Sequence, residues 1–261
     1  MAPMTSAPWV AAVLCSLIVT TLTRDGLDLR YQVTGSGPAL LLPAFNFRWG
    51  DYLDVGLLTR RFTVVTASPR GFGASGRLAA DAGYRVADLA SDLVAIMKAV
   101  GFERFSVFGY SFTGVFAPWL AHLTGRVDAI VSGGFQIAGD YSPLYPEIQA
   151  LSAAAEADPA VWTDLNSRFD NRAALEFYRE LSELPPDFLI SDLPCPLFAF
   201  WGEEDEEIAR GGGVQLLAAG LDGRGLEHAS FPGHDHEGML AHINEAVPSV
   251  LAWFDGLPRA E

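Results

Sequence analysis

Residues 105–114 read Phe105-Ser106-Val107-Phe108-Gly109-Tyr110-Ser111-Phe112-Thr113-Gly114, and the rest of the chain is best interpreted outward from them. The first four residues favour a strand, and an apolar run from Val115 to Leu123 that favours a helix follows directly. A serine on a sharp turn between a strand and a helix is strained, so the residues two positions before and after it must be small. Gly109 meets this demand, whereas Thr113 meets it only in part. The stretch predicts a nucleophile elbow at Ser111; the alternative is that Ser111 only caps the following helix.

The composition predicts one large α/β domain with a sizeable core. The chain has 261 residues, of which 50% are hydrophobic and 11% aromatic, so disorder is not expected. Seventeen basic residues against 32 acidic ones give a formal net charge of −15. Such a charge disfavours nucleic acid and anionic membranes as partners, and it slows the approach of strongly anionic substrates.

The N-terminus holds an apolar stretch, Trp9 to Leu22, that is too short for a comfortable membrane span. No Lys or Arg precedes it and no small-x-small cleavage site follows it, as a secretory signal requires. We expect residues 1–19 to be an uncleaved extension, and a weak signal or anchor is the alternative. The two cysteines, Cys15 and Cys195, lie in unlike contexts, and Cys195 is expected to be a small buried hydrophobe. The predicted location is therefore the reducing cytoplasm.

Strand and helix patterns alternate along most of the chain. Thr20–Arg24 and Leu27–Val33 flank Asp25-Gly26, which predicts a hairpin. Further strands are expected at residues 39–42, 61–67, 105–108, 127–131, 196–201 and 226–231, and helices at residues 84–100, 115–123, 215–221 and 236–254. Strands separated by helices predict an α/β fold whose central sheet is mostly parallel and covered by helices on both faces.

The alternation stops between Gly139 and Pro194. Before Pro194, this segment contains five prolines and three helix-like pieces, at about residues 147–158, 160–169 and 172–184. We expect residues 139–194 to form a small helical lid inserted between two parts of one core, residues 20–138 and 195–256.

The residues that would activate a serine follow late strands. A serine hydroxyl is a poor nucleophile unless a base lies within hydrogen-bond reach and an acid orients that base. Asp205 follows the strand at 196–201, and His236 follows the last strand. Because catalytic groups of parallel sheets gather beyond the carboxyl ends of strands, we expect these residues to converge on Ser111. Asp140 is the reserve acid and His234 the competing base.

With these landmarks in order, the chain resembles the α/β-hydrolase-fold family over residues 20–256. Members carry Gly-x-Ser-x-Gly, Gly-x-x-Asp after a late strand and Gly-His or Asp-His before the last helix; here these read Gly109–Thr113, Gly202–Asp205 and Asp235-His236. Arg70-Gly71-Phe72-Gly73-x-Ser75 also matches a loop typical of the family. The resemblance implies that Ser111 is the nucleophile, Asp205 the acid and His236 the base. It further implies that the backbone N–H groups of Phe45 and Phe112 form the oxyanion hole.

The chain departs from the family at three places around this site. Pro43-Ala44 replaces a usual His-Gly pair, Ser68 stands where Asp is common, and Thr113 stands where Gly is common. These departures leave the shape of the oxyanion site open.

The predicted activity is serine hydrolysis of a small or medium apolar ester through acyl transfer to Ser111. The alternatives are a C–C bond, lactone or thioester hydrolase with the same residues, and a non-catalytic ligand-binding member of the fold. Asp205 lies in an acidic run, residues 203–207, which as an alternative is only a solvated loop or helix start. Seven aromatic residues are candidates for an apolar pocket, with core packing as the alternative: Phe45, Phe47, Trp49, Phe112, Trp119, Phe135 and Tyr141.

No cofactor is expected. Three histidines near the C-terminus, His234, His236 and His242, lie close to acidic residues but lack the spacing of a metal-ligand set. The expected partner is a small apolar molecule, without nucleic acid or membrane.

Overall fold

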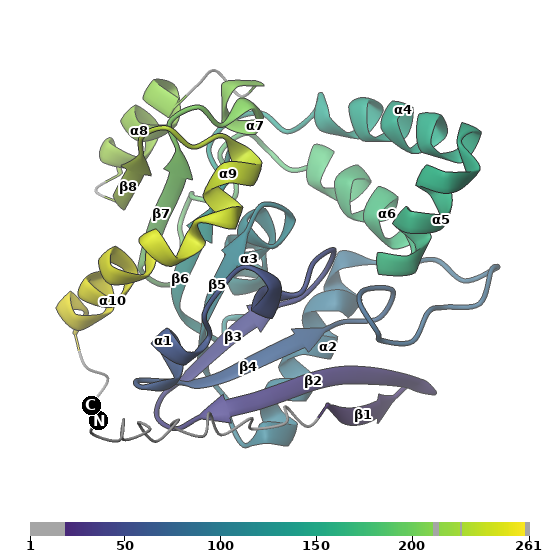
Figure 1. Cartoon of the computed structure of the whole chain (residues 1–261), viewed down its shortest axis with the longest axis horizontal. Coiled ribbons are helices and arrows are strands. Elements are labelled where there is room, and N and C mark those ends of the chain that lie inside the picture. Colours follow the sequence, from purple (N-terminus) through teal and green to yellow (C-terminus); the bar gives the residue numbers. More distant parts are fainter. Residues whose placement is uncertain (1–18, 211–213, 225, 259–261) are drawn as a thin grey trace, which may run out of the picture.

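A computed structural model describes residues 19–210, 214–224 and 226–258 of the chain, and in these residues eight strands form one sheet (Figure 1). The strand order is β1-β2-β4-β3-β5-β6-β7-β8. Strand β2 is antiparallel to both β1 and β4, and all pairs from β4 onward are parallel. The bounds are β1 (Thr20–Arg24), β2 (Leu27–Gly35), β3 (Ala39–Pro43), β4 (Thr63–Ser68), β5 (Phe105–Tyr110), β6 (Val127–Gly133), β7 (Leu197–Gly202) and β8 (Glu227–Phe231). The predicted mostly parallel α/β sheet is confirmed.

The hairpin β1–β2 turns at Asp25-Gly26, as predicted. Both residues have positive φ, 53° and 76°, which is the backbone of the tight turn that matches the twist of paired strands. Arg24 therefore pairs directly with Leu27.

Strand β3 shows how the sheet is buried on both faces. All five of its residues are buried, and successive side chains enter different core clusters. Ala39 and Leu41 belong to the core cluster that also contains residues of α2 (Val86–Val100), α3 (Phe112–Thr124) and α8 (Val214–Asp222). Leu40 and Leu42 belong to a second core cluster, with residues of α1 (Gly56–Thr59), α9 (His236–Ala241) and α10 (Val247–Gly256). In Figure 1, α9 and α10 accordingly lie in front of the sheet, and α2 and α3 lie behind it.

The prediction of one closing helix over residues 236–254 is wrong. Helix α9 ends at Ala241, a 3-10 turn spans Ile243–Glu245 and α10 starts at Val247. Pro248 lies in the first turn of α10, where a missing N–H costs nothing. In a continuous helix its ring would clash with the carbonyl group of Asn244. The short elements η1 (Trp49–Asp51), α1 and α7 (Glu206–Arg210) were not predicted.

Three helices lie between β6 and β7 in the segment predicted as a lid: α4 (Leu144–Ala157), α5 (Pro159–Arg168) and α6 (Asn171–Ser182). They form a separate layer beside the sheet in Figure 1. The start of α6 is tied to the core, because Asp170 accepts a hydrogen bond from Tyr84 Oη at 2.9 Å. Arg172 Nη2, at the start of α6 itself, also donates to Asp170, at 2.7 Å. The Asp170 N–H also donates to the Gly71 carbonyl at 2.7 Å.

Among the described residues, none of the helices has the length and apolar character needed to cross a membrane. The expectation for residues 1–19 falls almost entirely outside the described part of the chain, as does Cys15. Cys195 is half-buried, and burial raises the pKa of its thiol to about 12, so the thiol is unreactive at neutral pH.

Candidate active site

Ser111 occupies the strained turn between β5 and α3. Its φ of 53° and ψ of −124° lie outside the regions that side-chain-bearing residues usually adopt. The Ser111 N–H donates to the Gly133 carbonyl at 2.8 Å, which anchors the turn to the end of β6. Although Ser111 precedes α3, its side chain makes no capping hydrogen bond. The alternative that Ser111 only caps the helix is therefore not supported.

The tight turn requires two glycines, of which the sequence motif singled out one. A Cβ on Gly109 would lie 2.1 Å from the Thr113 carbonyl oxygen, and a Cβ on Gly114 would lie 2.4 Å from the Gly133 carbonyl oxygen. Both approaches are shorter than any side chain tolerates. The first explains the Gly-x-Ser pattern, and the second depends on β6, which pattern alone does not place beside Gly114.

Thr113 closes the turn where the family usually has glycine. Its buried Oγ1 accepts a hydrogen bond from the Tyr110 N–H (3.0 Å) and donates one to the Tyr110 carbonyl (2.9 Å). The extra side chain therefore makes a link across the elbow, and its methyl group is accommodated in the core. This departure from the family pattern adds a contact to the turn.

His236 lies between Ser111 and Asp205. Its Nε2 is 2.8 Å from Ser111 Oγ, and its Nδ1 is 3.0 Å and 3.2 Å from the two carboxylate oxygens of Asp205. With the proton on Nδ1 directed at the carboxylate, Nε2 is left to accept the serine proton. The structure thus brings together the three side chains that the sequence analysis selected from three separate loops.

Asp205 also starts a helix, so its two interpretations are compatible. One carboxylate oxygen accepts hydrogen bonds from the N–H groups of Glu207 (2.9 Å) and Ile208 (3.4 Å) at the beginning of α7. The side chain is fully buried, unlike its acidic neighbours Glu203 and Glu204. Fixed by these bonds, the carboxylate can orient the imidazole.

The electrostatic surroundings of His236 favour its protonated form. Burial lowers the pKa of the imidazole, but the hydrogen bond and charge of Asp205 more than offset that effect, with Glu207 and Glu237 adding to it. The net result is a pKa above the usual value of a histidine. An imidazole with such a pKa can accept a proton when it is neutral, and it is protonated in mild acid.

The reserve residues have other partners. His234 Nε2 lies 3.2 Å from Glu245 Oε2, and its ring stacks on that of His242 with centroids 4.9 Å apart. Asp140 accepts hydrogen bonds from the N–H and the Oγ of Ser142, both at 2.9 Å. Among the described residues, no group of three or more His, Cys, Asp or Glu side chains is arranged to hold a metal ion.

Phe45 and Phe112, the expected oxyanion-hole residues, lie against each other. Their rings meet edge to face with centroids 5.2 Å apart, and Phe45 also stacks on Phe72 at 4.3 Å. Phe112 is the first residue of α3, where backbone N–H groups have no acceptor within the helix. The substituted Pro43-Ala44 pair is held in place, because Pro43 accepts a bond from Trp49 Nε1 and the Ala44 N–H donates to Ala67, both at 2.8 Å.

The aromatic surroundings of the elbow include residues from the inserted helices. Phe112 contacts Phe177 (4.4 Å, perpendicular) and Tyr178 (5.3 Å, nearly parallel) of α6. The sequence analysis missed both, although the apolar face of the helix predicted at 172–184 was a usable signal. Of the predicted pocket aromatics, five are buried in the core: Phe45, Trp49, Phe112, Trp119 and Tyr141.

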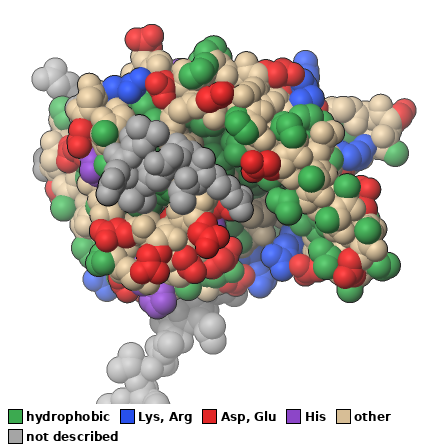
Figure 2. Space-filling model, turned by 90° about the horizontal axis from the view of Figure 1, so that it is seen from above, with side chains coloured by type: hydrophobic (Ala, Val, Ile, Leu, Met, Phe, Trp, Pro, Cys, Tyr) green, Lys and Arg blue, Asp and Glu red, His purple; other side chains and the backbone are tan. Residues whose placement is uncertain are grey.

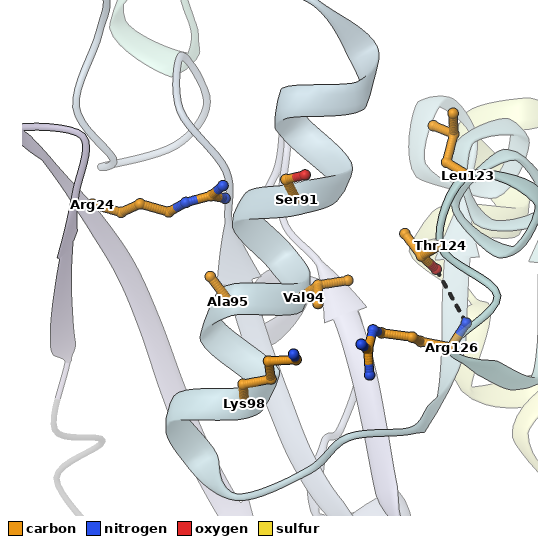
Figure 3. Close-up of a pocket in the computed structure, with 8 residues that line it drawn as sticks. All are labelled: Arg24, Ser91, Val94, Ala95, Lys98, Leu123, Thr124 and Arg126. Carbon is orange, nitrogen blue, oxygen red and sulfur yellow. Dashed lines mark hydrogen bonds between the residues drawn. The ribbon is translucent and has the colours of Figure 1, made fainter.

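A surface cavity of about 370 Å³ lies between α2 and the end of α3 (Figure 3). Its three cations already have acidic partners: Arg24 pairs with Asp92, and Lys98 and Arg126 share Glu103. It contains none of the residues around Ser111, so we do not regard it as part of the candidate active site.

Comparison with known proteins gives one family model, described as the alpha/beta hydrolase fold, which matches residues 42–169. A curated fluoroacetate dehalogenase from a Burkholderia species is 39% identical over 85 residues, or 30% of this chain. That match spans only 27% of the dehalogenase.

Solved structures are similar over almost the whole chain. A hydrolase from Pseudomonas aeruginosa PA01 has a TM-score of 0.69 at 22% identity and covers 92% of this chain and 98% of its own. An esterase from Thermogutta terrifontis has a TM-score of 0.67 at 17% identity (91% and 97% covered). An enol-lactonase from Burkholderia xenovorans LB400 has a TM-score of 0.68 at 15% identity (90% and 100% covered). At these identities the likeness establishes a shared fold.

Proposed function

We propose that this chain, a member of the α/β-hydrolase-fold family, is a serine hydrolase that cleaves carboxylic esters. The observation that carries the proposal is the continuous line of hydrogen-bonding atoms from Asp205 through His236 to Ser111, with 3.0 Å and 2.8 Å separations. A serine in a strained turn beside an oriented imidazole is the arrangement that nucleophilic acyl transfer requires.

The first half of the reaction forms an acyl-enzyme. His236 Nε2 accepts the Ser111 proton as Oγ bonds to the ester carbonyl carbon, and the carbonyl electron pair moves onto oxygen. The N–H groups of Phe45 and Phe112 donate to this oxyanion, a contribution typically worth about 10²–10³ in rate for one donor. The electron pair on the oxyanion then re-forms the carbonyl double bond, and the carbon–oxygen bond to the alcohol breaks. His236 gives its proton to the departing alkoxide.

The second half hydrolyses the acyl-enzyme. His236 accepts a proton from a water molecule as the water oxygen bonds to the acyl carbon. When the second tetrahedral intermediate collapses, the bond to Ser111 breaks and the proton returns to Oγ. The products are the alcohol and the carboxylic acid, and the enzyme is restored without a cofactor.

A small or medium apolar ester fits the surroundings best. The elbow is bordered by Phe112 and by Phe177 and Tyr178 of α6, so the inserted helices serve as the lid of an apolar acyl site. The face of the molecule where these helices lie carries more acidic than basic side chains (Figure 2), in keeping with the charge of −15. This charge disfavours anionic substrates. A small neutral molecule in the cytoplasm is the proposed partner.

Dehalogenation is the less favoured alternative, in spite of the curated relative's name. Displacement of a halide from a saturated carbon by Ser111 would form an ether, which water does not cleave under mild conditions. An acyl carbon instead forms an ester that the same residues can hydrolyse. Lactones, thioesters and activated C–C bonds meet this condition and are the second candidates.

Labelling with a fluorophosphonate tests the proposal directly. We expect the wild type to be labelled covalently and the Ser111→Ala variant to remain unlabelled. A panel of p-nitrophenyl esters of increasing chain length then gives the acyl preference, which we expect to peak at short to medium chains. Residual Ser111→Ala turnover within about tenfold of the wild type, equivalent to roughly 1.4 kcal/mol, would contradict the assignment. A well-folded wild type that resists labelling would indicate a ligand-binding protein.

A further inference from the structure

We propose that Tyr110 is a positioning residue for this hydrolase: its hydroxyl holds the backbone of His236 at the height at which the imidazole reaches Ser111. The proposal rests on the proposed function above. Tyr110 Oη donates a hydrogen bond to the His236 carbonyl oxygen at 2.8 Å, across 126 positions of the chain. The residue next to the nucleophile thus contacts the residue that carries the base.

The direction of the Tyr110 side chain follows from the end of β5. Ser111 leads into α3 on one face of the sheet. Tyr110 belongs to the core cluster on the opposite face, together with Phe200 of β7 and Met239 of α9. Its ring lies 5.8 Å from that of Phe200 and 5.4 Å from that of His236, measured between centroids. The side chain is fully buried, and its hydrogen bond to the start of α9 is partly buried.

Two consecutive glycines make room for this tyrosine. A Cβ on Gly134 would lie 2.3 Å from Tyr110 Cζ and 2.6 Å from Oη, and a Cβ on Gly133 would lie 2.7 Å from Cδ2. Gly134 also has a φ of +60°, which favours glycine. Because the Gly133 carbonyl accepts the Ser111 N–H, the same segment supports both the nucleophile and the tyrosine.

This arrangement gives the base a second fixed point. Asp205 holds the imidazole at Nδ1, and Tyr110 holds the main chain of the same residue. Helix α9, which begins at His236, has only six residues and is preceded by a loop with Gly233 at φ +76°. Without the tyrosine hydroxyl, the start of α9 has one fewer link to the elbow, and the separation of Nε2 from Oγ is less well defined.

The rival explanation is that the bond only satisfies a buried hydroxyl, which almost always finds an acceptor. Tyr141 provides a matched control, because it is equally buried and its hydroxyl donates to the Ile137 carbonyl, which belongs to none of the three reacting residues. Tyr110→Phe and Tyr141→Phe each remove one oxygen atom and keep the ring. Both should therefore lose a similar amount of Tm.

The experiment compares kcat, KM, the fluorophosphonate labelling rate and the pH profile of kcat/KM for the two variants and the wild type. We expect Tyr110→Phe alone to lower kcat and the labelling rate by about fivefold or more, with KM within about twofold. The acidic limb of its kcat/KM profile should move to lower pH. Asp205 raises the pKa of His236, and a looser contact between the two residues makes this increase smaller.

The positioning role would be overturned if Tyr110→Phe lowered kcat by less than about fivefold and left the acidic limb of kcat/KM unmoved. An equal loss of kcat in Tyr141→Phe would overturn it as well. Those results leave the proposed function intact, because the wild type is still labelled and Ser111→Ala is not. Failure of the wild type to react would instead overturn the proposed function, and the role of Tyr110 with it.

Discussion

His236 Nε2 lies 2.8 Å from Ser111 Oγ, although β6 and β7 separate the strands that lead to these two residues. The loop after β8 has to cross back over the carboxyl ends of those strands to achieve this contact. It passes close to Gly202, where a Cβ would lie 2.1 Å from the His234 carbonyl oxygen. The Glu204 N–H donates to that same oxygen at 3.0 Å. The glycine of the Gly-x-x-Asp motif therefore serves the histidine loop as well as the acid.

Asp205→Asn should abolish most of the activity, whereas Asp140→Asn should not. Removing the charge that orients an imidazole and stabilises its protonated form typically costs roughly 10³–10⁴-fold in kcat. Asp140 bonds only to Ser142 among the contacts described, so its amide variant should keep kcat within about twofold. Steady-state kinetics on one p-nitrophenyl ester compare the two variants. A crippled Asp140→Asn beside an active Asp205→Asn would move the acid to the loop after β6.

Thr113→Val should destabilise the protein, and Thr113→Ser should not to the same degree. Valine preserves the volume but removes the oxygen that bonds both the N–H and the carbonyl of Tyr110, which leaves a buried N–H unpaired. Such a loss costs about 1–3 kcal/mol in unfolding free energy. Urea unfolding of the two variants measures the difference. A Thr113→Val variant as stable as the wild type, beside a destabilised Thr113→Ser variant, would show that the methyl group, and not the hydroxyl, is what matters.

Asp92→Asn should destabilise the fold strongly, although Asp92 lies away from the three side chains around Ser111. The fully buried Asp92 carboxylate accepts bonds from Arg70 Nε and Nη2, both at 2.7 Å, and from Arg24 Nη1 at 3.0 Å. Breaking a buried pair in this way typically costs about 3–5 kcal/mol, because the buried Arg70 charge loses its buried partner and keeps only the exposed carboxylate of Asp25.

The control is Asp164→Asn, which breaks an exposed pair with Arg168 and should cost less than about 1 kcal/mol. Unfolding midpoints in urea separate the two, and kcat per folded molecule should be unchanged in both. Comparable midpoints for the two variants would contradict this account.

The parallel core was predictable because burial on both faces leaves a strong mark in the sequence. Continuous apolar runs such as 39–42 identify strands, and Asp25-Gly26 identifies a hairpin through local backbone preference alone. The closing helix was predicted too long because apolar periodicity continues through Pro248, whereas the backbone there has to break.

Parts of the candidate site lay beyond prediction for a different reason. The position of Ser111 follows from a local motif, and the choice of His236 over His234 followed from family position. The approach of Gly114 to Gly133, and of Tyr110 to the His236 carbonyl, arises only when distant segments pack. No periodicity in a single segment records such contacts, although the pair Gly133-Gly134 is visible in the sequence as two adjacent glycines.

The pH dependence of the reaction should identify the base. His236 has a pKa above the usual histidine value, set by burial on one side and by Asp205, Glu207 and Glu237 on the other. A protonated imidazole cannot accept the Ser111 proton, so kcat/KM should be constant at alkaline pH. It should fall tenfold per pH unit below a midpoint that lies above about 6.5.

His236→Gln should lose nearly all turnover and the acidic limb with it, because glutamine cannot accept the serine proton. His234→Gln should keep both the rate and the limb, since His234 faces Glu245 and stacks on His242. The measurement is kcat/KM against pH for the wild type and the two variants on the same ester. An active His236→Gln enzyme with an unchanged acidic limb would assign the base to another residue, and a limb lost only in His234→Gln would assign it to that histidine.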